Sequence, residues 1–223
     1  MARGRELAGG GRAVEIAPER VAGWFERFAD RHGGARETRL SAASAEVVAA
    51  DGSTATADVP FGGLGHDLGT RSGLDVGPLV EHLNRTRTLG LVLVRKGAHS
   101  VGVSRGGAVE QSSTDRHLVH GRTKAGGWSQ QRYARRRAGE AQRALASAAD
   151  AVARVLLPRR GELDGIVLGG DRQALEALRA DPRLAELLAA AEPRVLDVAE
   201  PRRAVLDEAA RRAVAVEIGV RES

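Results

Sequence analysis

The alternation of hydrophobic and polar positions changes character near residue 88. Residues 89–95 form a continuous apolar run, and residues 99–104 alternate between apolar and polar, which is typical of buried and half-buried β-strands. A further strand begins at residue 108, and residues 116–122 continue the strand pattern. Because glycine-containing turns separate the first runs, the pattern predicts an antiparallel meander.

A long helix is predicted to follow over residues 129–157, with one apolar stripe at helical spacing. The stripe consists of Tyr133, Ala134, Ala138, Ala141, Leu145, Ala148, Val152 and Val155. The later predicted elements are strands at 163–168 and 194–198 and helices at 171–180, 182–191 and 201–216. The expected fold class of residues 88–220 is therefore α/β, with a mixed sheet of an antiparallel meander plus parallel α/β units and flanking helices.

The region before residue 88 has a different pattern. Residues 1–12 are rich in glycine and arginine and are expected to form a disordered tail, followed by a small α+β region over 13–87. The predicted elements are a strand at 14–16, a helix at 18–32, strands at 38–48 and 53–59 joined around Asp51-Gly52, a glycine-rich loop at 60–77 and a helix at 76–85. The loop lacks the known phosphate-loop patterns, so it is either a connector or a functional loop of another kind.

The composition is that of a globular protein without cysteine chemistry. Of the 223 residues, 42% are hydrophobic and none is cysteine, which excludes disulfides, thiolate metal sites and cysteine nucleophiles. A signal peptide is not visible, and no apolar run approaches the roughly 20 residues of a membrane-spanning helix. A cytoplasmic protein without membrane contact is expected. The net charge of +5 agrees with an anionic partner.

Several familiar catalytic patterns are missing from the sequence. It contains no G-x-S-x-G nucleophile elbow, and its six histidines have no metal-binding spacing on a helix. The first meander strand, 89–95, carries no carboxylate, which argues against a two-metal nuclease. No metal or cofactor is therefore expected.

The segment Gly126-Gly127-Trp128-Ser129-Gln130-Gln131 is hard to explain by folding alone. A glycine pair lets the backbone adopt positive φ and approach another molecule closely. The helix that follows offers free N–H groups and the positive end of its dipole. Directly after the segment come Arg132, Arg135, Arg136, Arg137 and Arg143. A polar segment backed by arginines suits contact with a phosphate backbone.

The two glutamines of this segment limit its chemistry. A glutamine amide is not a useful acid or base near neutral pH, so it is a poor catalyst where proton transfer is needed. It can position a water molecule, and a backbone N–H can stabilise an oxyanion. Such a site suits a substrate that is already activated, such as an aminoacyl or peptidyl ester on tRNA.

The run from His120 to Arg137 resembles the loop and helix of the release-factor-like (VLRF-type) domain of ribosome quality control, in its bacterial branch. That family in turn resembles the catalytic middle domain of eukaryotic and archaeal peptide release factors, which is RNase H-like. Gly127-Trp128-Ser129-Gln130 matches the G-x-x-Q pattern of the family. The resemblance covers residues 88–220, and it implies that this region is a catalytic domain.

The resemblance implies a peptidyl-tRNA hydrolase that acts on stalled large ribosomal subunits. The loop of Gly126 and Gly127 would enter the peptidyl-transferase centre, with Gln130 as the working glutamine and Gln131 as the alternative. Contacts to ribosomal RNA or tRNA would come from Arg122, Lys124, Trp128, Arg132, Arg135 and Arg136. Two other functions remain open, a non-catalytic ribosome- or RNA-binding module and a nuclease that cuts the tRNA acceptor end. The oligomeric state does not follow from the sequence.

Overall fold

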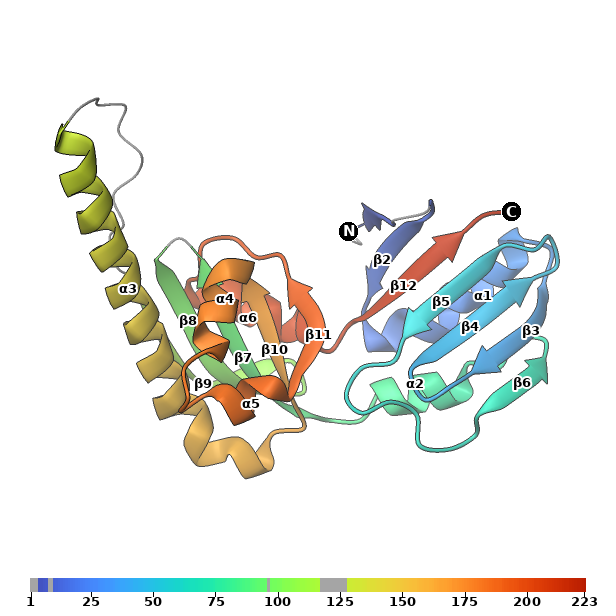
Figure 1. Cartoon of the computed structure of the whole chain (residues 1–223). Coiled ribbons are helices and arrows are strands. Elements are labelled where there is room, and N and C mark those ends of the chain that lie inside the picture. The colour runs from blue at the N-terminus through green and yellow to red at the C-terminus, as the bar shows by residue number, and fades with distance from the viewer. Residues whose placement is uncertain (1–3, 8–9, 96, 117–127) are drawn as a thin grey trace. The chain divides into compact units, whose positions relative to one another are not determined.

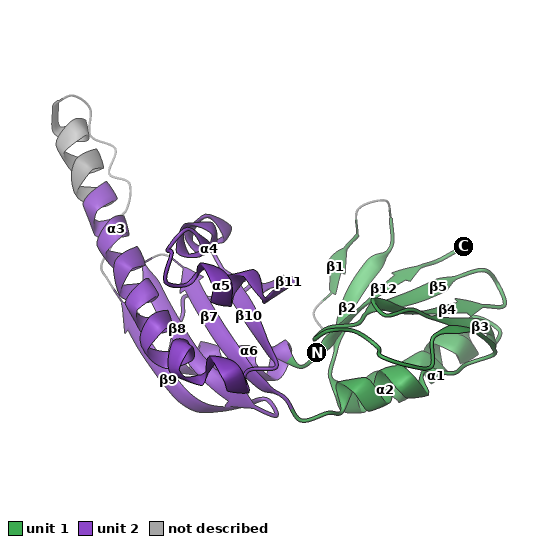
Figure 2. Cartoon of the chain, turned by 60° about the horizontal axis from the view of Figure 1, so that its bottom comes forward, with its two compact units in different colours: residues 1–86, 214–223 green, residues 87–213 purple. Residues whose placement is uncertain are grey.

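The computed structural model of the chain describes residues 4–7, 10–95, 97–116 and 128–223, with the side chains of residues 128–137 outside this description. The chain forms two compact units (Figure 2). Unit 1 comprises residues 1–86 and 214–223, and unit 2 comprises residues 87–213. No helix among the described residues is both long enough and apolar enough to cross a membrane.

Unit 1 is a seven-stranded antiparallel sheet with strand order β1-β2-β12-β5-β4-β3-β6 (Figure 1). Its strands are β1 (Gly4–Glu6), β2 (Arg12–Ile16), β3 (Ala35–Leu40), β4 (Ser44–Ala49), β5 (Thr54–Asp58), β6 (Gly69–Ser72) and β12 (Val216–Arg221). Its helices are the 3-10 turn η1 (Pro18–Arg20), α1 (Val21–Arg31) and α2 (Gly77–Leu83).

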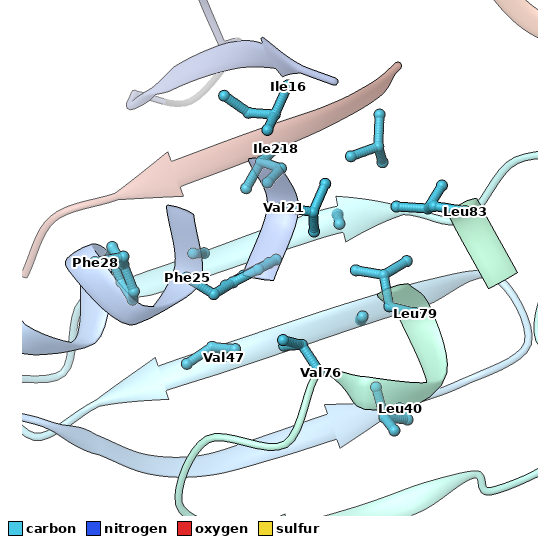
Figure 3. Close-up of a cluster of buried hydrophobic side chains, with 14 of the residues drawn as sticks. Ile16, Val21, Phe25, Phe28, Leu40, Val47, Val76, Leu79, Leu83 and Ile218 are labelled. Carbon is cyan, nitrogen blue, oxygen red and sulfur yellow. The ribbon is translucent and has the colours of Figure 1, made fainter. Parts of the chain in front are cut away.

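The core of unit 1 lies between these helices and one face of the sheet (Figure 3). Val21 and Phe25 of α1 and Leu79 of α2 are fully buried against sheet residues such as Val47 and Ile218. These α1 residues recur at helical spacing, because side chains three or four positions apart share one face of a helix. The predicted helix is confirmed, although its first turn is a 3-10 turn.

Three expectations for unit 1 are wrong. The strand predicted over 38–48 is two strands, β3 and β4, because Ser41 makes a turn between them. The hydroxyl of Ser41 accepts a hydrogen bond from the N–H of Ser44 at 2.9 Å, which favours a turn over extended backbone. The predicted loop contains β6, which pairs with β3. The tail expected to be disordered contains β1, which pairs with β2.

The C-terminal strand β12 belongs to unit 1 rather than to the domain expected over 88–220. The last helix, α6 (Arg203–Ala213), ends before residue 216, and β12 then runs between β2 and β5. Val216, Ile218 and Val220 are buried while the residues between them are partly exposed. This period of two is the strand pattern, and it overrides the helical continuation predicted to residue 216.

Unit 2 is a mixed five-stranded sheet in the order β11-β10-β7-β8-β9. Its strands are β7 (Thr88–Arg95), β8 (Ala98–Arg105), β9 (Ala108–Arg116), β10 (Gly165–Gly170) and β11 (Ala191–Leu196). The strands β7, β8 and β9 form an antiparallel meander, and β10 is parallel to both β7 and β11. The α/β fold class with a meander and parallel units is confirmed.

Helices cover both faces of the sheet of unit 2. They are α3 (Trp128–Leu156), α4 (Arg172–Arg179), α5 (Ala185–Ala189) and α6, with the 3-10 segment η2 (Leu157–Glu162) after α3. The first three pack with Val101 and Leu168 in one core cluster. On the opposite face Leu206 of α6 approaches Gly102, where a Cβ would lie 2.9 Å from its Cδ2 atom.

The helix α3 is longer than the sheet it packs on. Its 29 residues span about 43 Å at 1.5 Å per residue, whereas the eight residues of β8 span roughly 26 Å. Ala148 and Val152 are fully buried, as the apolar stripe predicts, but Ala138 and Ala141 are exposed. Among the stripe residues whose side chains are described, the packing face is therefore the part in the C-terminal half of α3, which meets the sheet (Figure 1).

Candidate functional site

The candidate site residues fall on the start of α3 and the segment before it. Arg122, Lys124, Gly126 and Gly127 lie outside the described residues. The backbone of α3 begins at Trp128, one residue before the predicted start, and so includes the remaining candidates. These are Trp128, Gln130, Gln131, Arg132, Arg135 and Arg136, whose side chains lie outside the description.

The strand that leads towards this site ends at one edge of the sheet of unit 2. Arg116, the last residue of β9, is level with Ala98 of β8. Ala98 in turn pairs with the last residue of β7, and Val94 of β7 is level with the last residue of β10. We use the name carboxyl edge for this end of the sheet, where β7 and β10 have their C-terminal residues. The chain leaves the sheet there and resumes its described course at the N-terminus of α3.

Position along α3 determines which residues share a face with the glutamines. Residues 130 and 141 are eleven positions apart, which is three turns with an offset of only about 20°. By the same spacing residues 132, 136, 143 and 154 share a different face. The start of α3 therefore presents position 130 on one side of the helix and a row of arginines on another.

The described arginines of this row are not neutralised by acids. Arg143 donates from Nε to the carbonyl of Gly139 at 3.2 Å, and Arg154 donates from Nη2 to the hydroxyl of Ser113 on β9 at 2.8 Å. Both side chains are exposed, and neither has a carboxylate partner among the residues that the structure describes. A guanidinium bound only to neutral oxygens retains its charge for an external anion.

Two arginines at the carboxyl edge differ from these, because they are paired with acids. Arg95 donates from Nη1 to Oδ1 of Asp197 at 3.0 Å, and Nε of Arg116 lies 3.1 Å from Oε1 of Glu200. Paired charges of this kind contribute little to the attraction of a distant anion. Among the described residues, Arg143 and Arg154 of α3 thus keep a charge for an external anion that Arg95 and Arg116 do not.

Two acids next to strand ends of unit 2 have structural partners. Asp164 accepts a hydrogen bond from the N–H of Thr88 at 2.7 Å, and Asp171 caps α4 by accepting from the N–H of Gln173 at 3.0 Å. Across the described ranges, no group of three or more histidine, cysteine or acidic residues is close enough to hold a metal ion.

A pocket that the sequence did not predict opens between α3 and α4 at the carboxyl edge. Its volume is about 430 Å³. The lining consists of Val94, Gly97, Ala98, Ala141, Gln142, Ala144, Leu145, Asp171, Gln173, Ala174 and Ala177. Three separate segments contribute to it, so no local motif could have identified it before the sheet order was known.

Comparison with known families identifies the class of this chain. Residues 87–219, more than half of the chain, match the model of the Actinobacteria/chloroflexi VLRF1 release factor. The fold is thus that of a release-factor-like domain, and the chain belongs to the VLRF1 release factor family of Actinobacteria and Chloroflexi. The resemblance drawn from the glycine–glutamine segment and its flanking pattern is confirmed.

Individual relatives are more distant. Peptide chain release factor subunit 1 of Thermococcus onnurineus is 37% identical over 95 residues, which is 42% of this chain and 23% of that protein. The same factor of Pyrococcus abyssi is also 37% identical over 95 residues, with the same shares. The chain therefore spans about a quarter of the length of these curated relatives.

Solved structures of translation factors are also similar to the chain. The crystal structure of an archaeal translation termination factor, aRF1, aligns with a TM-score of 0.37 and 17% identity over 75% of this chain and 51% of that one. Dom34 of S. cerevisiae, a translation termination-like factor, aligns with a TM-score of 0.33 and 9% identity, over 93% of this chain and 65% of that one.

Proposed function

We propose that this protein is a hydrolase that releases the nascent chain from peptidyl-tRNA on stalled large ribosomal subunits. The observation that carries the proposal is the G-x-x-Q pattern of Gly127 to Gln130, at the start of α3 in a member of a release-factor family. This proposed function requires ribosomes as the partner and the cytoplasm as the compartment. Neither a metal nor a cofactor takes part.

Gln130 is proposed to position the attacking water at the ester carbonyl. Its amide can both donate to and accept from a water molecule, although it cannot take up the proton itself. The water oxygen bonds to the acyl carbon, the bond from that carbon to the ribose oxygen of the tRNA breaks, and the proton lost by the water ends on that leaving oxygen. The N–H groups in the first turn of α3 have no partner within the helix, and they lie at the positive end of its dipole. Donors of this kind stabilise the oxyanion that forms when water adds to an ester. Gln131 is the alternative water-positioning residue.

The arginine row of α3 is proposed to contact RNA phosphates. Arg132 and Arg136 share the row with Arg143 and Arg154, which have no carboxylate partner among the described residues, and Arg135 lies beside the row. Arg122, Lys124 and Trp128 complete the contact around the glycine pair, with Trp128 suited to stacking on an unpaired base. Binding to ribosomal subunits should therefore weaken steeply with salt, because each phosphate contact releases counterions.

The test is peptide release from purified large subunits that carry a labelled peptidyl-tRNA. Wild type is compared with Gln130→Ala and Gln131→Ala, and the 3′ end of the released tRNA is sequenced. We expect free peptide, an intact tRNA end, and loss of release in Gln130→Ala with subunit binding retained. A shortened tRNA end identifies an acceptor-end nuclease instead, and activity that is abolished by EDTA identifies a metal-dependent one. If the wild-type protein binds the subunits but releases no peptide, it is a non-catalytic binding module.

A further inference from the structure

The pocket between α3 and α4 has two apolar walls that face each other. Ala141, Ala144 and Leu145 line it from α3, and Ala174 and Ala177 line it from α4. Apart from Leu145, these side chains end at Cβ and so project little into the space between the helices. A volume of about 430 Å³ falls in the range of roughly 300–1,000 Å³ that is usual for small-ligand sites.

Three exposed polar side chains join this apolar lining, and each keeps hydrogen-bonding groups that no described residue occupies. Gln142 comes from α3, and Asp171 and Gln173 come from the start of α4. One carboxylate oxygen of Asp171 accepts from the N–H of Gln173, but the other has no hydrogen bond to a described residue. Neither glutamine amide has a side-chain hydrogen bond within the described part of the chain. The pocket thus combines apolar walls with free acceptors and donors.

The pocket lies on the same face of α3 as position 130. Ala141 is eleven residues after Gln130, so the two positions are about 16 Å apart along the helix and nearly in line. A molecule whose reacting end is held at the start of α3, and which runs down this face, reaches the pocket. This step rests on the proposed function, because it takes position 130 as the place where the substrate reacts.

We propose that the pocket binds one unpaired base of an RNA strand, specifically a base with an exocyclic amino group. A flat ring suits a pocket lined by short apolar side chains, because proteins that read an unstacked base hold the ring between aromatic or apolar side chains and hydrogen-bond its edge. The free oxygen of Asp171 accepts from the amino group, and the amides of Gln142 and Gln173 are placed to pair with the remaining edge atoms. An apolar peptide side chain fits less well, because it buries these three polar groups without partners.

The test uses the full-length protein and fluorescently labelled single-stranded RNA, with an abasic site introduced at each position near the 3′ end in turn. We expect one abasic position to weaken binding by about tenfold, towards the lower end of the effect of losing a base stacked on an aromatic side chain, because the lining here is aliphatic. Ala174→Leu and Ala141→Leu fill the pocket with a residue that also favours helix, so each should weaken wild-type RNA binding and remove the sensitivity to that abasic position. Ala146→Leu, at an exposed position of α3 outside the lining, should bind as wild type does.

Asp171→Asn tests the base edge. Asparagine caps a helix as well as aspartate does, so α4 is retained, but one oxygen is replaced by an amide donor. We expect weaker binding when the base at the sensitive position is adenine or cytosine, and no loss when it is uracil. The pocket proposal is overturned if the filled variants keep wild-type affinity and abasic profile. It is also overturned if an apolar peptide, and not RNA, loses binding in them.

The same measurements distinguish this proposal from the proposed function. RNA binding requires no hydrolysis, so the pocket proposal is judged by the RNA affinity and abasic profile of the filled variants, and the proposed function by peptide release in Gln130→Ala. If Gln130→Ala releases peptide normally, the proposed role of Gln130 in hydrolysis is wrong. The RNA-binding result still tests the pocket proposal independently. If the filled variants bind normally and Gln130→Ala loses release, only the pocket proposal fails.

Discussion

At the scale of single residues, the sheet of unit 2 depends on close approaches that only glycine allows. A Cβ at Gly102 would lie 2.8 Å from the carbonyl oxygen of Gln111 and 2.9 Å from Cδ2 of Leu206. One of these atoms belongs to the backbone of the neighbouring strand and cannot rotate away. The absence of a side chain therefore allows α6 to pack directly on the meander.

Replacing this glycine should destabilise the protein. Gly102→Ala is expected to lower the free energy of unfolding by roughly 1–3 kcal/mol, the usual cost of overpacking a core. Gly161→Ala is the matched control, because a Cβ there has no atom within 4 Å and its φ is not positive. It should be neutral or slightly stabilising. Urea unfolding of both variants measures the difference, and equal effects would contradict the packing seen at Gly102.

Asp51 gives unit 1 a pH dependence. Its carboxylate accepts from the N–H of Ser53 at 2.8 Å and lies 2.8 Å from Nδ1 of His32. Both hydrogen bonds lower the pKa of Asp51, and the one from the N–H of Ser53 has the larger effect. A lowered folded-state pKa means that stabilisation is complete above the unfolded value of about 3.9 and is lost as pH falls through the folded value.

The expected result is that Asp51→Ala unfolds more easily than wild type at pH 7, and that the difference shrinks below about pH 4. Asp51→Asn keeps the acceptor for Ser53 but not the charge, so it should lose less stability than alanine at neutral pH. Urea unfolding between pH 3 and pH 7 provides the measurement. If the free energies of unfolding of Asp51→Ala and wild type differ by the same amount at every pH in this range, the charge of Asp51 does not contribute to stability.

At the scale of elements, α3 shows what a sequence pattern can and cannot specify. Its length, its apolar stripe and its arginine faces follow from 3.6-residue periodicity and were predicted. The point at which the stripe stops being buried depends on how far the sheet extends, which is set by strands remote in sequence. The same limit applies to the pocket, which arises only when Val94, Ala141 and Ala174 are brought together.

The two halves of α3 should respond differently to charge. Ala148→Lys places a charge in the core and should lower the free energy of unfolding by more than about 2 kcal/mol. Ala138→Lys, on the same predicted stripe but exposed, should change it by less than about 0.5 kcal/mol. Thermal or urea unfolding of the pair measures this. Comparable losses at both positions would mean that the whole stripe is buried.

At the scale of the whole molecule, unit 2 is inserted into unit 1, since the chain returns to the first sheet for its final strand. The local alternation of Val216, Ile218 and Val220 indicates a strand, but nothing local says which sheet it joins. The pairing of residues some 200 positions apart, such as Ile218 with Val14, is determined by the tertiary structure and not by the local sequence. The fold class was therefore predictable, whereas the membership of this strand was not.

Removing residues 216–223 should unfold unit 1 and leave unit 2 folded. The deletion takes a strand from between β2 and β5, so each of them loses one of its two ladder partners and the core loses Ile218. Hydrogen exchange should show lost protection in β4 and β5 and retained protection in β7 and β8. Deleting only residues 222–223, which follow β12, is the control. Protection of β4 and β5 that survives the longer deletion would contradict the observed sheet order.

The most direct test of the proposed hydrolysis is single-turnover release of a labelled peptide from large subunits carrying peptidyl-tRNA, with subunit occupancy measured in the same samples. Wild type should release the peptide and leave a tRNA that can be aminoacylated again, because only the ester is cut. Gln130→Ala should occupy the subunits equally and release the peptide at least about a hundredfold more slowly, in line with the loss of a positioned catalytic group. Equal release rates at equal occupancy would contradict the role given to Gln130, and a tRNA that cannot be recharged would contradict ester hydrolysis.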